Sequence, residues 1–281
     1  MGIVVGIDIG GSTTKIAGFQ GKDMLIPVQI SASNAIASLF GAFGKFLYDN
    51  KLALEDIQQV NLTGVGCSAV DQAIYGLPTY RVDEFTANGV GGGYFAQGKK
   101  EFMVVSMGTG TSFVGVKDGI PTHLGGIGIG GGTIIGLSKL MLNTSDIDKI
   151  QELALGGQVG HIDLRVGDIS EKPLPGLNLE VTASNFGKAS SRATCEDKAA
   201  GIVHMVIESI CQTAALISQG TNMKDFILIG ALTNFPECEA VCSMIKTLFP
   251  DLNFYVPKDG EYGTAIGTAL AAKCCLKHIA G

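Results

Sequence analysis

Residues 6–15 read GIDIGGSTTK and directly follow the apolar residues 3–5. Asp8, two glycines and three hydroxyl side chains thus stand at the end of an apolar strand, which indicates that a polar ligand lies against this turn. Glycine lets backbone N–H groups approach an anion closely, so a phosphate fits the pattern. Because residues 16–19 are again apolar, the segment predicts a hairpin with a phosphate-binding turn, with an ordinary hairpin turn as the alternative.

Two common phosphate loops do not fit this segment. A Walker loop requires G-x-x-x-x-G-K-[ST], and no segment of the chain has that spacing. A dinucleotide fingerprint opens a helix, whereas residues 12–19 are rich in β-branched side chains and favour a strand.

A second segment has the same order of features. Residues 103–119 read MVVSMGTGTSFVGVKDG, which is an apolar strand, a turn of glycine and hydroxyl residues, and a second strand. Two such hairpins predict two similar α/β domains that each present a phosphate turn to a shared cleft.

The rest of the chain alternates helical and strand patterns. We expect helices at residues 33–51, 81–95, 134–142, 145–155, 198–219, 235–249 and 262–278, and strands at 59–63, 226–232 and 253–256. Asp83 is expected to cap the helix over 81–95, for which a loop is the alternative. The glycine-rich residues 124–133 are expected to form a loop that opens a helix, where free N–H groups can bind an anion or a nucleotide.

Composition limits the class of protein. The 281 residues suffice for two domains, and 46% hydrophobic with 16% charged residues is typical of a globular chain. A net charge of −6 without a basic cluster argues against a nucleic-acid surface. There is neither a long uninterrupted apolar run nor a basic leader with a cleavage signal. We therefore expect a cytoplasmic protein that does not enter a membrane and has a small-molecule partner.

The cysteines indicate reduced thiols. There are seven, with no C-x-x-C pair, which suits an intracellular protein better than a disulfide framework. Cys238 and Cys242 lie four residues apart on a predicted helix, and metal binding by them is a less favoured alternative.

Six segments together resemble one family. They are GIDIGGSTTK, VDEF (82–85), SMGTGTS (106–112), LGGIGIGGGTIIGL (124–137), TASNFGK (182–188) and EYGTAIG (261–267). In this order they are similar to type II pantothenate kinase, within the superfamily of actin, Hsp70 and sugar kinases. The resemblance implies two similar ribonuclease-H-like α/β domains that flank a nucleotide cleft. We expect residues 1–100 to carry the phosphate turn and the catalytic base, and residues 101–281 to carry nucleotide and dimer contacts.

The resemblance also implies a reaction. It is the transfer of a phosphoryl group from ATP, with Mg²⁺, to the terminal hydroxyl of pantothenate or a related pantoic amide, the first step of coenzyme A biosynthesis. The family further implies a homodimer, packed through the helix after Lys198, and inhibition by coenzyme A thioesters at the ATP site.

Roles for single residues follow from the resemblance and from the chemistry of phosphoryl transfer. Glu84 aligns with the family's catalytic base, which accepts the proton of the attacking hydroxyl, although a glutamate is also favoured in a first helical turn. Asp8 is expected to contact magnesium through water, or else to cap its turn. Lys15 would neutralise developing charge, or else be an exposed strand lysine. The phosphate- and nucleotide-binding residues are expected to be Gly10, Gly11, Ser12, Thr13, Lys15, Thr109, Gly110, Ser112, Gly130, Gly131, Gly132 and Gly230, the last having a plain turn as its alternative. For Ser184, Asn185 and Phe186 the pattern predicts no particular contact, and packing is the alternative to a site role.

One position departs from the family. Just before the glycine loop the family usually places an arginine that binds substrate and stabilises the transferring phosphoryl group, and here that position is His123. Histidine cannot form the planar two-pronged contact of a guanidinium. Either His123 substitutes, Arg81 or Lys15 fills in, the acceptor is not pantothenate, or the kinase is weak. The alternative is that His123 is a surface histidine without a role in the site.

Two other functions stay open. A regulatory ATPase resembling dehydratase activators would need cysteines in or near residues 124–137 to hold an iron–sulfur cluster, and that loop has none. A protein that binds ATP or coenzyme A without catalysis is the other, motivated by His123.

Overall fold

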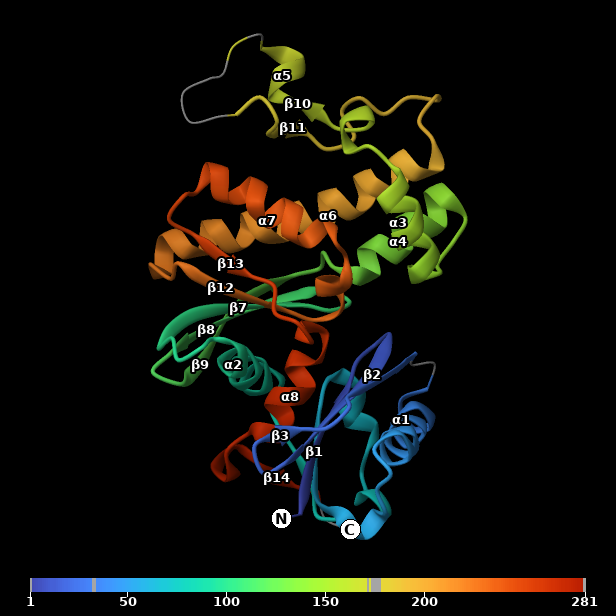
Figure 1. Ribbon diagram of the computed structural model, residues 1–281, viewed down its shortest axis with the longest axis vertical. Helices are drawn as coiled ribbons and strands as arrows, with labels where there is room; N and C mark the ends of the chain where they lie inside the picture. The colour runs from blue at the N-terminus through green and yellow to red at the C-terminus, as the bar shows by residue number, and fades with distance from the viewer. Residues whose placement is uncertain (1, 32–33, 171, 173–177, 280–281) are drawn as a thin grey trace.

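Two large β-sheets organise the chain. The computed structural model describes residues 2–31, 34–170, 172 and 178–279. One sheet has the strand order β14–β6–β5–β1–β2–β3, with β4 also paired to β2, and the other has the order β13–β12–β7–β8–β9. Figure 1 shows the first sheet at the bottom and the second above it, so the two hairpins found in the sequence belong to different sheets.

The first sheet carries the first hairpin. Its strands are β1 (Ile3–Ile9), β2 (Thr13–Gln20), β3 (Asp23–Met24), β4 (Val28–Ser31), β5 (Ile57–Thr63), β6 (Thr79–Arg81) and β14 (Lys277–His278). β1 is antiparallel to β2 and parallel to β5, which in turn is parallel to β6. The carboxyl ends of these three parallel strands therefore lie at one edge of the sheet.

Helix α1 (Ala35–Asp49) covers a face of this sheet and buries Leu39, Phe43 and Phe46. The Asn34 side chain accepts a hydrogen bond from the Ala37 N–H at 3.0 Å and so caps the helix. The predicted helix over 33–51 is confirmed within these bounds, and its first residue lies outside the described part of the chain.

The second sheet carries the second hairpin and the larger core. Its strands are β7 (Glu101–Met107), β8 (Thr111–Lys117), β9 (Ile120–Ile127), β12 (Asp225–Ile229) and β13 (Asn253–Tyr255). The helices packed on it are α3 (Gly131–Leu142), α4 (Ile147–Gly156), α6 (Cys195–Thr221) and α7 (Glu237–Leu248). Between α4 and α6 the chain forms a small separate unit of β10 (Leu164–Arg165), α5 (Val166–Ile169) and β11 (Thr182–Ser184), at the top of Figure 1.

Helix α6 has the length and the apolar composition of a membrane span, but 61% of its most apolar window is buried inside the structure. Its buried side chains, among them Ile202, Val206 and Ile210, belong to the core of the second sheet. A core helix explains its composition.

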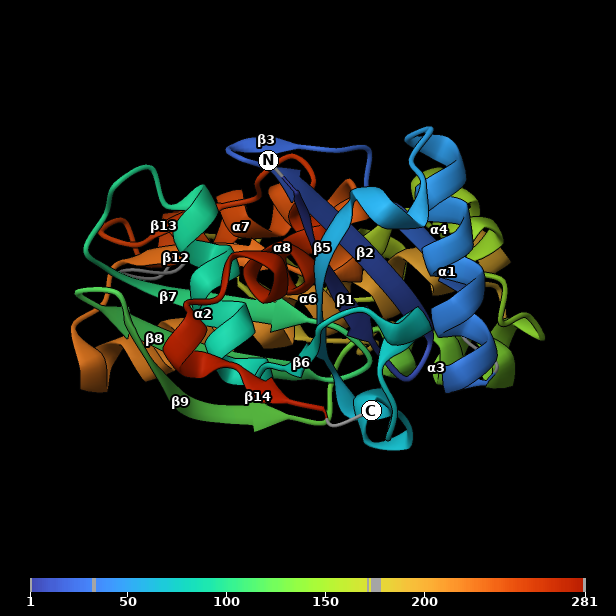
Figure 2. The same ribbon diagram turned by 90° about the horizontal axis from the view of Figure 1, so that it is seen from below.

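A pair of helices joins the two halves. α2 (Glu84–Phe95) and α8 (Gly263–Leu270) cross between the sheets, as Figures 1 and 2 show. A Cβ on Gly267 would overlap the carbonyl oxygen of Ala87, and one on Gly91 would overlap that of Gly263. Thr264 Oγ1 donates to Asn88 Oδ1 at 2.8 Å across the same contact. Glycine therefore allows the two backbones to touch at this crossing.

Several elements differ in bounds or type from the sequence prediction. The helix predicted over 81–95 begins at Glu84, because Arg81 is part of β6. Residues 124–127, predicted as loop, belong to β9, because backbone pairing with β8 holds them as a strand despite their glycines. The predicted strand over 226–232 ends at Ile229, and a short 3-10 turn, Ala231–Asn234, follows.

The final helix also differs, because the prediction extends it to residue 278 and it ends at Leu270. Ala271 leaves the helix with φ −57° and ψ 134°, and β14 then pairs antiparallel with β6. Tertiary pairing overrides helix propensity here. The predicted division at residue 100 separates β1–β6 from β7–β13, whereas β14 returns to the first sheet; the domain boundary itself stays a prediction.

The helix crossing predicts a large effect of one methyl group. Gly267→Ala should lower the free energy of unfolding by about 1–3 kcal/mol or more, because backbone atoms must separate to admit the Cβ. Gly44→Ala in α1, where a Cβ would meet open space, should raise it by about 0.5–1 kcal/mol. Chemical denaturation of both variants measures the difference, and equal stabilities would contradict this account of the crossing.

Candidate active site between two hairpin turns

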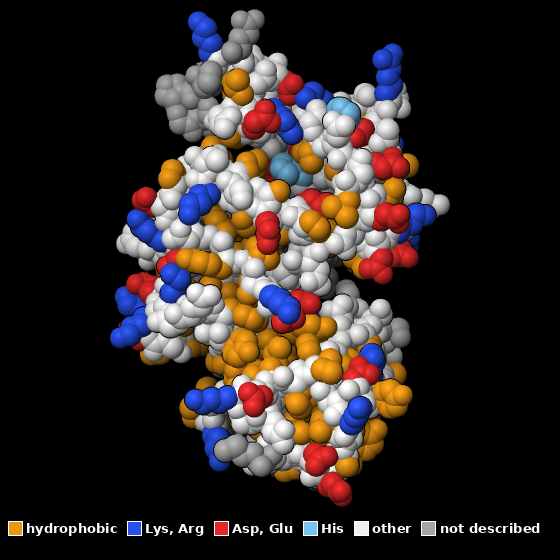
Figure 3. Space-filling view, viewed as in Figure 1, with side chains coloured by type: hydrophobic (Ala, Val, Ile, Leu, Met, Phe, Trp, Pro, Cys, Tyr) orange, Lys and Arg blue, Asp and Glu red, His pale blue; other side chains and the backbone are white. Residues whose placement is uncertain are grey.

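A cavity of about 960 Å³ lies where the two halves face each other. Its wall combines the β1–β2 turn, the β7–β8 turn, the first residue of α2, the start of α3, the N-terminal part of α4 and the turn after β12. Figure 3 shows the corresponding hollow between the upper and lower parts, at the right of the view.

The first turn forms one side of the cavity. Gly10 N–H donates to the Thr13 carbonyl at 3.0 Å and closes the turn. Gly10, Gly11, Ser12 and Thr13 all line the cavity, as the sequence predicts for a phosphate turn. Their contact with a phosphate stays a prediction.

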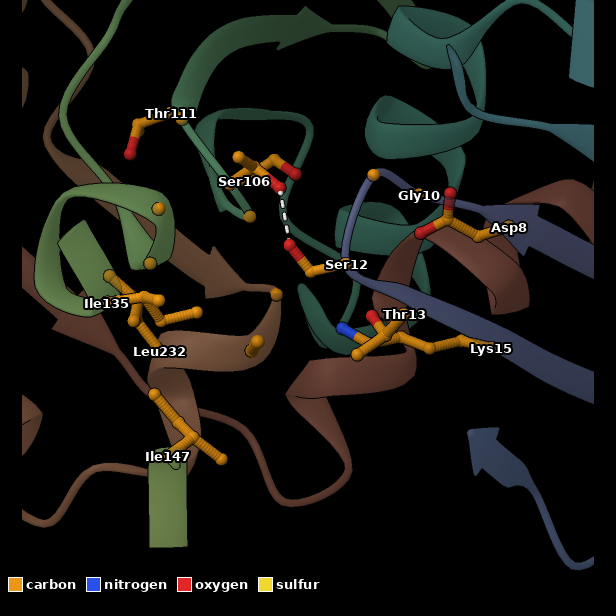
Figure 4. A pocket seen from close by; sticks show the side chains of 18 of the residues that line it. Asp8, Gly10, Ser12, Thr13, Lys15, Ser106, Thr111, Ile135, Ile147 and Leu232 are labelled. Atoms are coloured by element: carbon orange, nitrogen blue, oxygen red, sulfur yellow. Dashed lines mark hydrogen bonds between the residues drawn. The ribbon is translucent and has the colours of Figure 1, made fainter. Parts of the chain in front are cut away.

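The second turn meets the first across the cavity. Ser12 Oγ lies 3.3 Å from Thr109 Oγ1, the dashed line in Figure 4, and this hydroxyl pair forms a hydrogen bond between the two turns. Thr109, Gly110 and Ser112 also line the cavity. The hairpins that are distant in sequence therefore present their hydroxyl groups to one space.

The start of α3 supports the second turn from behind. The N–H groups of Gly131 and Gly132 donate to the carbonyls of Gly108 and Thr109 at 2.8 and 2.9 Å. Gly130 is buried and is not among the lining residues, and a Cβ there would lie 2.7 Å from the Thr109 oxygen. The N–H groups of the first helical turn are therefore hydrogen-bonded to the second hairpin turn, although Gly131 and Gly132 still line the cavity.

Three ionisable side chains converge at the end of the cavity near the first turn. Lys15 lies directly across from Asp8 in the antiparallel register of β1 and β2. Glu84, the first residue of α2, lines the same cavity. Burial lowers the pKa of Lys15, and the charges of Asp8 and Glu261 oppose that shift. Lys15 is only 5% exposed, so the alternative of an exposed strand lysine is wrong.

Both carboxyl groups are perturbed in the same direction. Burial raises the pKa of Asp8, and the positive charge of Lys15 opposes the rise. Asp8 has no hydrogen-bond donor among the described residues, so it does not cap its turn. Burial also raises the pKa of Glu84, with smaller contributions from the charges of Asp8 and Asp83. Asp83 itself caps α2, as predicted, by accepting from the Thr86 N–H at 3.0 Å.

The opposite end of the cavity is apolar. Ile135, Ile147 and Leu232 gather there in Figure 4, away from Asp8 and Lys15, and Phe235 joins them in the lining. Gln151 crosses this end and donates to the Asn234 carbonyl at 2.8 Å. These residues were not predicted from the sequence, because they come from three separate elements and only their apolar character could have indicated them.

Gly230, predicted to lie beneath a nucleotide, connects β12 to this apolar end. Its φ is +97°, and a Cβ would lie 2.5 Å from the Met107 oxygen, so both the backbone and the space require glycine. It lines the cavity together with Ala231.

His123 lies outside the cavity. It sits on β9, and its ring stacks on that of Phe85 with centroids 3.8 Å apart. Neither the cavity nor the pocket beside it counts His123 among its lining residues. The structure thus brings Asp8, Lys15 and Glu84 together in the cavity wall, whereas His123 does not line it.

The TASNFGK segment is also apart from the cavity. Phe186 N–H donates to Asp163 Oδ1 at 2.7 Å, and Asn185 Nδ2 donates to Glu208 Oε2 at 2.9 Å. Asp163, which is fully buried, also accepts from His204 across 3.0 Å. These bonds fasten the small β10–β11 unit to α6, so the packing alternative describes this segment.

A smaller pocket of about 290 Å³ adjoins the cavity and shares Gly64, Val65 and Glu84 with it. Arg81, Cys67 and Ser68 belong to its wall. Glu84 therefore stands between two spaces, one lined by both hairpin turns and one lined by a guanidinium group.

The arrangement defines a class of protein. The structure is similar to that of the activator of 2-hydroxyisocaproyl-CoA dehydratase from Clostridium difficile, with a TM-score of 0.70 and 17% identity over 96% of this chain and 94% of that one. It is also similar to a glucokinase from Streptomyces griseus, with a TM-score of 0.58 and 13% identity over 97% of this chain and 100% of that one. The fold is that of the actin, Hsp70 and sugar-kinase superfamily, as predicted.

Sequence similarity then narrows the class. The Fumble family profile matches residues 79–254. A type II pantothenate kinase from Bacillus cereus is 30% identical over 286 aligned positions, which cover 95% of this chain and 98% of the relative. The chain belongs to the type II pantothenate kinase family.

The charge environment of Glu84 can be measured directly. In nucleotide-free protein, carbon NMR of the carboxyl groups should give a pKa for Glu84 above the ordinary glutamate value, because burial and two neighbouring carboxylates disfavour its ionised form. Asp83→Asn should lower that pKa while preserving the helix cap, since asparagine caps as well as aspartate.

Asp251→Asn, on the exposed surface of the other half, serves as the control and should leave the Glu84 titration in place. A Glu84 pKa at or below the ordinary value would contradict the described surroundings.

Proposed function

We propose that the protein transfers the terminal phosphoryl group of ATP to the terminal hydroxyl of pantothenate, giving 4'-phosphopantothenate. The observation that carries this proposal is the position of Glu84, between the space lined by both hairpin turns and the adjoining pocket. Membership of the type II pantothenate kinase family supports the choice of acceptor.

ATP would lie along the cavity. Its phosphates would reach the two turns, where glycine backbones and the hydroxyl groups of Ser12 and Thr109 are available. Its base would occupy the apolar end between Ile135, Ile147 and Leu232. Lys15, which is buried at the phosphate end, would place a positive charge beside the phosphoryl group as it is transferred.

Magnesium fits the phosphate end. Asp8 is a half-buried carboxylate that lines the cavity and has no hydrogen-bond donor among the described residues, and Mg²⁺ prefers such oxygen ligands while keeping several waters. When bound, the ion would neutralise phosphate charge. Asp8 would hold it, directly or through a water molecule.

Glu84 would accept the proton of the attacking hydroxyl. Its raised pKa makes the carboxylate a stronger base than an exposed glutamate, which favours proton transfer as the oxygen attacks. The rate should therefore depend on pH, because the active, deprotonated form of Glu84 is lost as the pH falls through its raised pKa. The acid limb of the rate should therefore lie above that of an ordinary glutamate.

We also propose a homodimer and inhibition by coenzyme A thioesters. A homodimer would use the part of α6 that stays accessible, which includes Leu216, 61% exposed. Coenzyme A thioesters would compete for the ATP cavity. A protein that binds ATP without turnover is the second candidate function, favoured by the position of His123 outside the cavity.

A matched pair of variants tests the proposal. ADP formation should depend on pantothenate in the wild type, and Glu84→Gln should lower kcat by about 10²- to 10⁴-fold because the base is lost while the shape is kept. Glu55→Gln, an exposed glutamate on another element, should leave kcat within about twofold, as surface changes usually do. Stimulation by pantothenate that survives Glu84→Gln would remove Glu84 as the base. If pantothenate has no effect on any form, the acceptor assignment is wrong.

A further inference from the structure

The pocket beside the cavity is built around Arg81. It lies at the carboxyl ends of β5 and β6, and the residues shared with the cavity are Gly64, Val65 and Glu84. Because Glu84 belongs to the walls of both spaces, an acceptor whose hydroxyl contacts Glu84 can extend into the adjoining pocket.

The Arg81 guanidinium has unused hydrogen-bonding capacity. Its Nη2 donates to the Val70 carbonyl, while its Nε is buried and has no partner among the described residues. The guanidinium also lies against the Cys67 thiol, whose pKa is raised by burial and lowered by this neighbouring charge. Since Arg81 also lines the pocket, an acceptor group bound there could pair with the N–H groups of the guanidinium that face the pocket.

The positive charge is also free of an ion pair. Within the described residues no carboxylate lies within 4.0 Å of Arg81, although the pocket wall contains Glu84. The N-terminus of α2 faces the same region and adds a partial positive charge. Ser68 adds a hydroxyl group to the wall. Planar anions such as carboxylates match a guanidinium fork better than they match an imidazole.

We propose that this pocket binds the anionic end of the acceptor and that Arg81 pairs with its carboxylate. This inference rests on the proposed function, since it names where a kinase with an acidic acceptor holds that acid. It also accounts for the departure at His123. A cation on β9 is dispensable when Arg81, three residues before Glu84, supplies the charge from the first sheet.

The experiment compares pantothenate with its neutral primary amide as acceptors. The kcat/KM of the acid divided by that of the amide measures recognition of the carboxylate. Changes in ATP binding or in the catalytic base affect both acceptors and cancel in this ratio. Arg81→Gln should lower the acid-to-amide ratio by about 10- to 100-fold, mostly through KM of the acid. Arg192→Gln, an exposed arginine on the surface, is the matched control and should leave the ratio unchanged.

A second pair of variants keeps the test decisive if Arg81→Gln does not fold. Val65 is 69% exposed and lies at the junction of the two spaces. Val65→Glu should lower the acid-to-amide ratio and Val65→Lys should raise it, each by roughly 2- to 5-fold.

The outcomes separate this inference from the proposed function. If neither acceptor stimulates ADP formation in the wild type, the proposed function fails, and this inference fails with it. If both acceptors stimulate ADP formation but the acid-to-amide ratio does not change in the Arg81 and Val65 variants, only this inference is overturned. A ratio that falls with His123→Gln and not with Arg81→Gln would also overturn it and assign the anion contact to β9.

Discussion

The backbone contact between α2 and α8 is the constraint on which the site depends. α2 begins with Glu84, and α8 follows the segment whose Gly260 carbonyl accepts from the Gly230 N–H at 2.9 Å beside the second sheet. Because Gly91 and Gly267 carry no side chain, these helices lie close enough to fix one half against the other. The Ser12–Thr109 contact of 3.3 Å is then possible, and with it a single cavity lined by both hairpin turns.

Charge is concentrated at one end of that space. Asp8 and Glu84 are both disfavoured as anions by burial, and Lys15 is disfavoured as a cation for the same reason. Each group would be stabilised by what a phosphoryl transfer brings: a metal ion for Asp8, a transferable proton for Glu84 and phosphate oxygens for Lys15. The protein thus holds perturbed groups in a cleft, a common feature of catalytic sites.

Local patterns allowed much of this fold to be predicted. The two hairpins, the Asp83 cap and the long apolar helix depend on neighbouring residues, and they are confirmed. Contacts between distant segments were not predictable in this way. The pairing of β14 with β6 replaced a helix, and pairing with β8 made a strand of glycine-rich residues. The apolar end of the cavity and the pocket at Arg81 arise only when separate elements meet, and the burial of Lys15 depends on packing across the sheet.

Phosphorus NMR of the product formed from ATP and pantothenate tests the central claim most directly. If Glu84 stands between the phosphates and the acceptor as proposed, each ADP formed should be matched by one phosphate monoester at the terminal hydroxyl of pantothenate. Release of inorganic phosphate with pantothenate unchanged would contradict the claim, because it would mean that water, and no bound acceptor, reaches the transferred group. An ester at the secondary hydroxyl would contradict the proposed orientation of the acceptor.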